Sequence, residues 1–340
     1  MVLKNSLFLS IYKYINNLDR RFSEYSLNLY SEKKSLITIL FHGLFNNDDE
    51  IRLNHVHPQQ SMTVEKFRQF IDYYVKHDYI FVSPDDIQNG LDPGKNHILI
   101  TFDDGYYNNN LALPILKEYN IPALFFISSN HIIQNKCFWW DVVYRQRISQ
   151  GYKIDKIFKE IESLKNKKNF DIEKYIKDKF GDNALKPLSN VDRPFTPKEL
   201  KIFSSNKHVF IGNHTTNHAI LTNYTNDEVR EEIENSQNSI FNMTGILPTM
   251  ISYPNGNYSN DIIRLSKMIK GLKFGITTIH KKNLFPLFLK KNDAFTISRF
   301  TLWGNRNIES QCKLFRSDIH LLKKIKSLLK RKTHEDSMSY

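Results

Sequence analysis

Short runs of apolar, mostly β-branched and aromatic residues recur along this chain, and longer stretches with helical spacing of apolar residues separate them. The short runs predict strands at Leu36–Phe41, Ile80–Ser83, Ile98–Phe102, Ala123–Ile127, Val209–Ile211, Met250–Tyr253, Phe274–Thr277 and Phe295–Phe300. The longer stretches predict helices at Val64–Lys76, Asn110–Tyr119, Asp227–Met243 and Asn260–Lys270. This alternation predicts an α/β fold in which helices cover a mostly parallel sheet, either open or closed as a barrel.

One segment interrupts the alternation. Residues 137–195 are polar, rich in lysine and helix-like, and we predict a helical insert there. The aromatic residues at its start, Trp139 and Trp140, favour core packing, with a sugar-stacking surface as the alternative. Around the insert, residues 35–305 are expected to form the main domain. A helical segment over 1–34 precedes it, and a basic amphipathic helix and tail over 306–340 follow it.

Composition narrows the classes of partner. The net charge of +12 favours anionic partners, but the basic residues are spread along the chain, as on an ordinary lysine-rich surface. No motif of a nucleic-acid-binding module is present, so we expect no nucleic-acid partner. The two cysteines, Cys137 and Cys312, make neither a disulfide scaffold nor a cysteine-rich zinc site. We expect both thiols to be reduced and buried.

The two ends of the chain bear on localisation. The N-terminal apolar run Leu7–Tyr12 is short and is followed at once by Lys13, unlike a secretory signal. No stretch approaches the about 20 apolar residues of a membrane span. Residues 314–332 combine helical spacing of apolar residues with many lysines, which suits either packing on the domain or contact with an anionic membrane surface. We expect a cytoplasmic protein, with peripheral attachment to the inner face of the membrane left open.

Polar residues capable of chemistry follow several of the predicted strands. His42 follows the first strand, Asp103 and Asp104 follow the third, and His214 and His218 follow Val209–Ile211. In parallel α/β folds the carboxyl ends of the strands meet on one face, where active sites are built. The sequence therefore predicts that these side chains share one site.

Two motifs carry most of the chemical signal. Adjacent carboxylates in Asp103-Asp104-Gly105 point in different directions, so one can bind a cation while the other handles a proton, although Asp-Gly is also an ordinary turn signal. His214 and His218 are four residues apart and would lie on one face of a helical turn. Two imidazoles and one carboxylate form the open three-ligand site typical of catalytic zinc.

Together these motifs resemble those of the polysaccharide deacetylase family, the NodB-type family 4 carbohydrate esterases. Thr101–Gly105 is similar to the family's Thr-Phe-Asp-Asp-Gly motif, and His214–His218 to its His-Ser/Thr-x-x-His motif. The resemblance extends from about Leu36 to Phe300, without the insert. It implies a deformed (β/α) barrel of mostly parallel strands, here with a helical insert and a C-terminal helix.

The resemblance also implies roles for single residues. Asp104, His214 and His218 would bind the metal, and Asp103 would be the catalytic base. The family's third motif corresponds to Ser252–Gly256, where its usual arginine and tyrosine are absent. Tyr253, Pro254 and Asn255 would line the substrate site there, and the backbone N–H of Asn255 would stabilise an oxyanion.

The general acid is predicted from a subgroup of the family. In relatives similar to poly-N-acetylglucosamine deacetylases, the first strand supplies this histidine, which corresponds here to His42; His280 is the alternative in a poorer context. Arg299 resembles a late arginine of this subgroup and would orient Asp103, with a surface salt bridge as the alternative.

The resemblance implies a metal-dependent hydrolase that removes N-acetyl groups from an N-acetylated sugar, a polysaccharide or a lipid-linked glycan. The metal would be zinc, with cobalt or nickel as alternatives. Such an enzyme would serve envelope polysaccharide or glycolipid biosynthesis. The open alternatives are an inactive carbohydrate-binding relative and an O-acetyl esterase.

Overall fold

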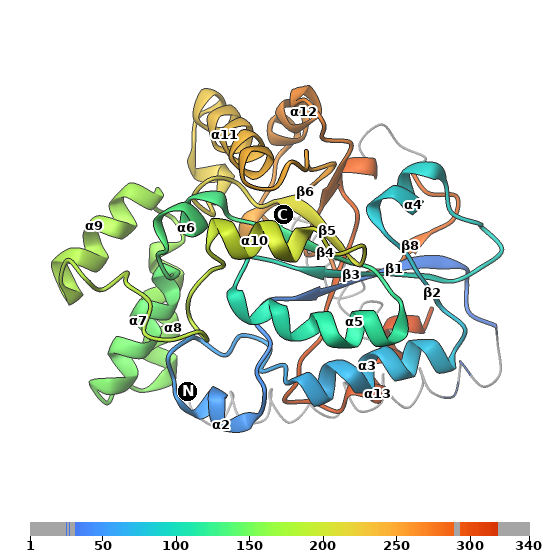
Figure 1. The fold of residues 1–340 in the computed structure, drawn as a ribbon, viewed down its shortest axis with the longest axis horizontal. Helices are drawn as coiled ribbons and strands as arrows, with labels where there is room; N and C mark the ends of the chain where they lie inside the picture. Colours follow the sequence, from blue (N-terminus) through green and yellow to red (C-terminus); the bar gives the residue numbers. More distant parts are fainter. Residues whose placement is uncertain (1–24, 26, 28–30, 289–292, 319–340) are drawn as a thin grey trace, which may run out of the picture.

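A computed structural model describes residues 25, 27, 31–288 and 293–318 of the chain. Within these residues one sheet runs through the centre of the molecule, in the order β7-β6-β5-β4-β3-β1-β8, with β2 paired to β3 and β9 to β1 (Figure 1). The strands are β1 (Ser35–Phe41), β2 (Ile80–Phe81), β3 (His97–Phe102), β4 (Ala123–Ile127), β5 (Val209–Asn213), β6 (Met250–Ser252), β7 (Phe274–Ile276), β8 (Asn283–Leu284) and β9 (Phe300–Thr301).

All strand pairs of this sheet are parallel except the pair of β1 with β8. The sheet curls toward closure through the segment that leads into β9. Ile297 forms a parallel bridge with Ile276 of β7, and Phe300 pairs with Ile39 of β1. The predicted α/β fold, a deformed barrel of mostly parallel strands, is therefore confirmed.

The central strands form because their residues are apolar and are covered on both faces, as is usual in parallel sheets. Every residue of β1, β3 and β4 is buried. Phe41 packs against Phe67 and Phe70 edge to face, each with 5.2 Å between ring centroids, and stacks on Phe102 at the same distance. This aromatic cluster fixes the ends of β1 and β3, from which the candidate site residues emerge.

Helices pack around the outside of the curled sheet, with α3, α5 and α13 below it and α11 and α12 above it in the view of Figure 1. Two helices begin at caps that the sequence encodes, Thr63 before α3 and a Thr225–Glu228 capping box before α11. The helices outside the insert are α2 (Asp48–Arg52), α3 (Val64–Lys76), α4 (Pro84–Asn89), α5 (Leu113–Tyr119), α6 (Ser129–Gln134), α10 (Pro197–Ser204), α11 (Asn226–Thr244), α12 (Asn260–Met268) and α13 (Ile308–Arg316).

The predicted insert contains three helices, α7 (Trp139–Ser149), α8 (Ile154–Leu164) and α9 (Asn169–Phe180), which lie at one end of the sheet (Figure 1). They share a buried apolar cluster of their own that includes Val143, Ile157 and Ile172. Arg145 in α7 forms a buried ion pair with Asp192, with 2.5 Å between Nη1 and Oδ2. The insert thus has its own core. The predicted domain boundaries stay predictions.

Several expected elements differ from the structure. The predicted strand Phe295–Phe300 is reduced to β9, because a 3-10 turn occupies Asp293–Phe295. The predicted helix Asn110–Tyr119 begins as a 3-10 helix over Tyr107–Ala112 and becomes α-helical at Leu113. The short strand β8 was not predicted, since two residues carry no periodicity.

The predictions for the chain ends are only partly covered by the structure. Most of residues 1–34, and residues 319–332 of the predicted basic helix, lie outside the described residues. Within the described part, Cys312 and Phe315 of α13 pack into the main core, next to the partly exposed Leu314. Cys312 and Cys137 are both free and buried, as predicted. No helix among the described residues has the length and apolar character needed to span a membrane.

Candidate active site

Asp104 lies at the carboxyl end of β3 in a strained backbone conformation. Its φ of 78° is followed by a φ of 89° at Gly105, so the chain leaves the strand through two consecutive left-handed residues. The Asp104 side chain is fully buried, and neither carboxylate oxygen has a hydrogen-bond partner among the described residues. A buried carboxylate without hydrogen bonds is costly unless a cation compensates its charge.

His214 and His218 approach this carboxylate from the loop after β5, and not from a helix. The expectation that they share a face of a helical turn is wrong, because Thr215 and His218 have positive φ values of 64° and 52°. Side chains stabilise this loop: Asn213 Oδ1 accepts a hydrogen bond from the N–H of Thr215 at 2.8 Å, and Thr215 Oγ1 accepts one from the N–H of Ala219 at 2.9 Å.

The loop nevertheless brings both imidazoles to Asp104. The Nε2 atoms of His214 and His218 lie 3.4 and 3.3 Å from Asp104 Oδ1, and one ligand atom from each residue lies within 4.8 Å of the others. Two ligand atoms that are each about 2.1 Å from one tetrahedral ion stand about 3.4 Å apart. The three residues therefore fit a divalent cation, both in their chemistry and in the spacing of each imidazole from the carboxylate.

Neighbouring groups prepare His214 for this role. Its Nδ1 lies 2.8 Å from the carbonyl oxygen of Ser252, to which it donates a hydrogen bond, so Nε2 presents its lone pair toward Asp104. Burial alone would lower the pKa of His214, but the nearby Asp103 and Asp104 carboxylates raise it above its ordinary value. Burial dominates at His218, and its pKa is lowered.

Asp103 points to a different set of partners. The guanidinium of Arg299 donates two hydrogen bonds to it, from Nη1 to Oδ1 at 2.7 Å and from Nη2 to Oδ2 at 2.6 Å, and Ser252 Oγ donates a third at 3.0 Å. Burial would raise the pKa of Asp103, but the charges of Arg299, His214 and His42 and the hydrogen bonds from Arg299 together outweigh burial and hold this pKa below its ordinary value. Arg299 is only 1% exposed, so the alternative of a surface salt bridge is wrong.

The structure separates the two candidates for the general acid. His42 is half-buried after β1 and lines the same cavity as Asp104, while its Nδ1 lies 2.7–2.9 Å from the side-chain amide of Gln60. His280 is exposed, does not line that cavity, and lies 3.2 Å from Thr301 Oγ1 through its Nε2. Position therefore favours His42.

The residues after β6 are placed differently from one another. Asn255 lines the cavity with a φ of 57°, and its side chain is exposed. Tyr253 is 1% exposed and donates a hydrogen bond to the carbonyl oxygen of Phe295 at 3.2 Å, so its side chain points into the core. Pro254 is buried and is not part of the cavity lining. Only Asn255 of these three residues lines the cavity.

The cavity has a volume of about 710 Å³. All three tryptophans of the chain line it, Trp139 and Trp140 from the insert and Trp303 from the segment after β9. The ring of Trp140 lies 4.6 Å from that of His218, between centroids. The predicted core role fits Trp139, which is 5% exposed, whereas the half-buried Trp140 also forms a wall of the site.

Comparison with known families places this arrangement. The family model described as polysaccharide deacetylase matches residues 90–271, which is more than half of the chain. The chain belongs to the polysaccharide deacetylase family. It is 30% identical over 130 residues to the poly-β-1,6-N-acetyl-D-glucosamine N-deacetylase of Staphylococcus epidermidis. This match covers 35% of the chain and 44% of the relative, which is less than half of that protein's length.

Solved deacetylase structures share the fold. The Streptococcus pyogenes deacetylase PplD superposes with a TM-score of 0.56 at 17% identity, over 83% of this chain and 99% of that one. IcaB from Ammonifex degensii gives a TM-score of 0.55 at 15% identity, over 84% and 98%. These similarities show that the chain shares the curled-sheet fold of these solved structures.

Some residues at the site of this polysaccharide deacetylase family member could not be found from the sequence. Gln60 contacts His42 from the loop before α3, and Trp303 lines the cavity after β9. No motif marks either residue. Ser252 had a signal, because it occupies the place of the family's arginine, and in the structure it shares Asp103 with Arg299.

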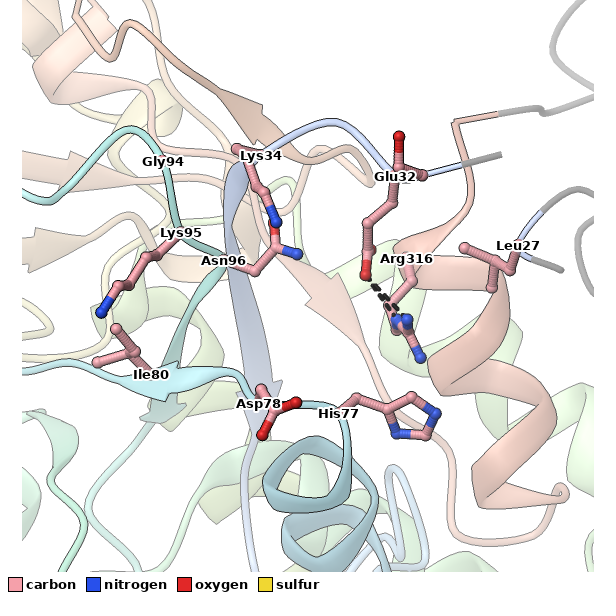
Figure 2. Close-up of a pocket in the computed structure, with 11 residues that line it drawn as sticks. Leu27, Glu32, Lys34, His77, Asp78, Ile80, Gly94, Lys95, Asn96 and Arg316 are labelled. Atoms are coloured by element: carbon pink, nitrogen blue, oxygen red, sulfur yellow. Dashed lines mark hydrogen bonds and ion pairs between the residues drawn. The ribbon is translucent and has the colours of Figure 1, made fainter. Parts of the chain in front are cut away.

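A second cavity, of about 530 Å³, lies at the amino ends of the strands (Figure 2). It is bordered by Lys34 before β1, Asn96 before β3 and the ion pair of Glu32 with Arg316, whose atoms are 2.9 Å apart. None of the candidate site residues lines it. Because active sites of such barrels lie at the carboxyl ends of the strands, we assign no part of the site to this cavity.

Proposed function

We propose that this chain is a metal-dependent hydrolase that removes the acetyl group from an N-acetylated saccharide. The observation that carries the proposal is the cluster of Asp104, His214 and His218 beside a second buried carboxylate, Asp103. One carboxylate lacks hydrogen bonds and faces two imidazoles, while the other is held by Arg299. Amide hydrolysis by an activated water requires both a group that binds the metal and a separate group that accepts the proton of the water.

In this proposal a divalent cation bound by Asp104, His214 and His218 supplies a Lewis acid that acidifies water and polarises the acetyl carbonyl. Asp103 accepts the proton of the attacking water. The water oxygen bonds to the acetyl carbon, the carbon–nitrogen bond breaks, and acetate and a free amine leave. The lowered pKa of Asp103 keeps it ionised at neutral pH, ready to accept that proton.

We assign the proton donor for the departing amine to His42. It lines the cavity with Asp104, and Gln60 holds its Nδ1 while Nε2 makes no hydrogen bond to any described residue. A positioned proton donor typically contributes about 10²–10⁴-fold to such a step. The backbone N–H of Asn255, on the cavity wall, is the proposed donor to the oxyanion.

Zinc is the proposed metal, because two imidazoles and one carboxylate with an open position form its usual catalytic site; cobalt and nickel are the alternatives. The proposed substrates are N-acetylated sugars, polysaccharides or lipid-linked glycans. The Staphylococcus epidermidis relative is named for its action on poly-β-1,6-N-acetyl-D-glucosamine. We therefore also propose membership of the subgroup that takes its acid from the first strand.

The test is acetate release from N-acetylated and O-acetylated saccharides, with metal content measured on the same preparation. Asp103→Asn should retain the metal and lose about 10²-fold or more of its turnover. Asp104→Ala should lose both. Asp261→Asn is the matched control, because Asp261 is an exposed carboxylate that pairs with Arg264 on α12. Normal turnover by Asp103→Asn refutes the mechanism, and release from O-acetyl groups alone identifies an esterase.

A further inference from the structure

The cavity of the proposed active site extends beyond the residues that the reaction needs. Helix α8 of the insert contributes Phe158, Ile161 and Glu162 to its wall, and Lys165 follows at the C-terminal cap of the helix. A volume of about 710 Å³ lies in the upper half of the ~300–1,000 Å³ range that accommodates drug-sized ligands. A single N-acetylated sugar leaves part of this space empty, so a second portion of the substrate has room against α8.

The apolar residues on this part of the wall continue outward along α8. Phe158 is 42% exposed and Ile154, one helical turn earlier on the same face, is 45% exposed. An adjacent face of α8 is already packed: Ile157 and Leu164 belong to the buried cluster of the insert, to which Phe158 does not contribute. The exposed apolar pair is therefore not required for the core of the insert.

The neighbours of Phe158 offer little to a polar ligand. His57 packs against it at 5.2 Å between ring centroids, and burial lowers the pKa of His57 to about 4, so this ring is uncharged at neutral pH. Glu162 and Lys165 pair with each other at 2.6 Å, so together they add no net charge to this wall. A sugar ring needs partners for several hydroxyl groups, whereas Ile154, Phe158 and Ile161 have no polar side-chain atom.

We propose that the substrate is an N-acetylated sugar linked to an alkyl or prenyl chain, and that this chain lies on Phe158 and Ile154. The acetamido group then reaches Asp104 and His218, while the chain follows the exposed face of α8 out of the cavity. This inference rests on the proposed function and specifies the substrate class of that site. It gives the insert a role in substrate selection.

The tryptophans provide a binding assay that does not depend on turnover, because all three of them line the cavity. The probes are the methyl and octyl β-glycosides of N-acetylglucosamine, below the concentration at which the octyl compound forms micelles, and the β-1,6-linked trisaccharide. We expect the octyl glycoside to bind about tenfold more tightly than the methyl glycoside. Relative to the methyl glycoside, the trisaccharide should show a smaller increase in affinity than the octyl glycoside. Acetate release from the same compounds gives kcat/KM.

Variants of two phenylalanines locate the effect. Phe158→Ser should remove the preference for the octyl glycoside, and Phe158→Leu should keep most of it. Phe170→Ser is the matched control, because Phe170 on α9 is 80% exposed and does not line the cavity. Its preference should be unchanged.

Equal binding of the methyl and octyl compounds would overturn the inference, and so would an octyl preference that survives in Phe158→Ser. A larger gain with the trisaccharide would show instead that the space by α8 takes further sugar. If the octyl preference is present and depends on Phe158 but none of the compounds releases acetate, the inference on the apolar chain stands and the proposed function fails.

Discussion

Replacing Arg299 with glutamine removes the positive charge that holds Asp103. Both residues are nearly inaccessible, at 1% and 3% exposure, and two hydrogen bonds of 2.6 and 2.7 Å join them. In Arg299→Gln the carboxylate of Asp103 keeps only the hydrogen bond from Ser252. Removing one partner of a buried ion pair typically costs about 3–5 kcal/mol of stability, since the other charge stays buried without compensation.

Protonation of Asp103 sets a limit on this loss. In Arg299→Gln the buried carboxylate of Asp103 can become neutral by binding a proton. Because pH 7 lies about three units above the ordinary carboxyl pKa of about 3.9, this protonation costs about 1.4 kcal/mol for each of those units. The destabilisation should therefore not exceed about 4 kcal/mol at pH 7 from this cause. In the wild type the pKa of Asp103 is lowered, so the contribution of this pair is complete above about pH 4 and is lost only as the pH falls further. The difference in unfolding free energy between the wild type and Arg299→Gln should therefore decrease by about 2–3 kcal/mol as the pH falls from 7 to 5.

Urea unfolding followed by tryptophan fluorescence measures the unfolding free energies of the wild type and of Arg299→Gln. A chelator should be present, because a cation at Asp104 would act as a second counter-charge for Asp103. Arg264→Gln is the matched control: Arg264 and Asp261 are 65% and 63% exposed, and such a pair contributes about 1 kcal/mol or less. The double variant Asp103→Asn/Arg299→Gln should recover much of the loss, because no buried charge remains.

Two results would refute this reasoning. One is a decrease in unfolding free energy in Arg299→Gln that is no larger than the decrease in Arg264→Gln. The other is a gap that stays constant or widens between pH 7 and pH 5, which would mean that Asp103 is not the group whose charge the arginine compensates.

Three further predictions concern two other residues of the site and a buried carboxyl group at the start of the insert. Zinc at about 100 times its Kd should stabilise the wild type by about 2.7 kcal/mol in thermal unfolding but leave His218→Ala nearly unchanged; equal shifts would exclude His218 as a ligand. Gln60→Leu removes the hydrogen bond to Nδ1 of His42 and should lower kcat about tenfold with little change in KM. An unchanged kcat would show that Gln60 does not position His42 as the proton donor. Burial raises the pKa of Asp141 to about 8, so the wild type loses stability as pH rises from about 4 toward 8, at up to about 1.4 kcal/mol per unit; Asp141→Asn should lack this slope in urea titrations, and parallel curves would contradict the shift.

The parts of the fold that were predictable are those with strong local signals. The runs at Leu36–Phe41 and Ala123–Ile127 are apolar at every position or nearly so, and they became buried strands at those positions. Helix α3 was predicted with its observed bounds, because Thr63 caps an amphipathic pattern. Elements of two or three residues, such as β8, depend on neighbours far away in the sequence and leave no periodic signal.

The proximity of the site residues was easier to predict than their local structure. The four-residue spacing of His214 and His218 indicated that their side chains lie close together, which they do, but a loop with two left-handed residues brings them together, and not a helical turn. Such a loop depends on Asn213 and Thr215 side chains bonding to the backbone, which spacing alone does not reveal. The sequence offered no sign that Gln60 would meet His42.

The sequence by itself determined the order of buried strands and helices, and hence which residues stand at the carboxyl ends of the strands. Those features depend on local patterns of burial and on the rule that parallel strands present their ends on one face. Only the tertiary structure decided between the two expected roles of Arg299, by placing its guanidinium against Asp103, and only it showed that α8 lines the cavity. Both contacts join residues far apart in the chain, where side-chain packing and electrostatics act through space and leave no periodic trace in the sequence.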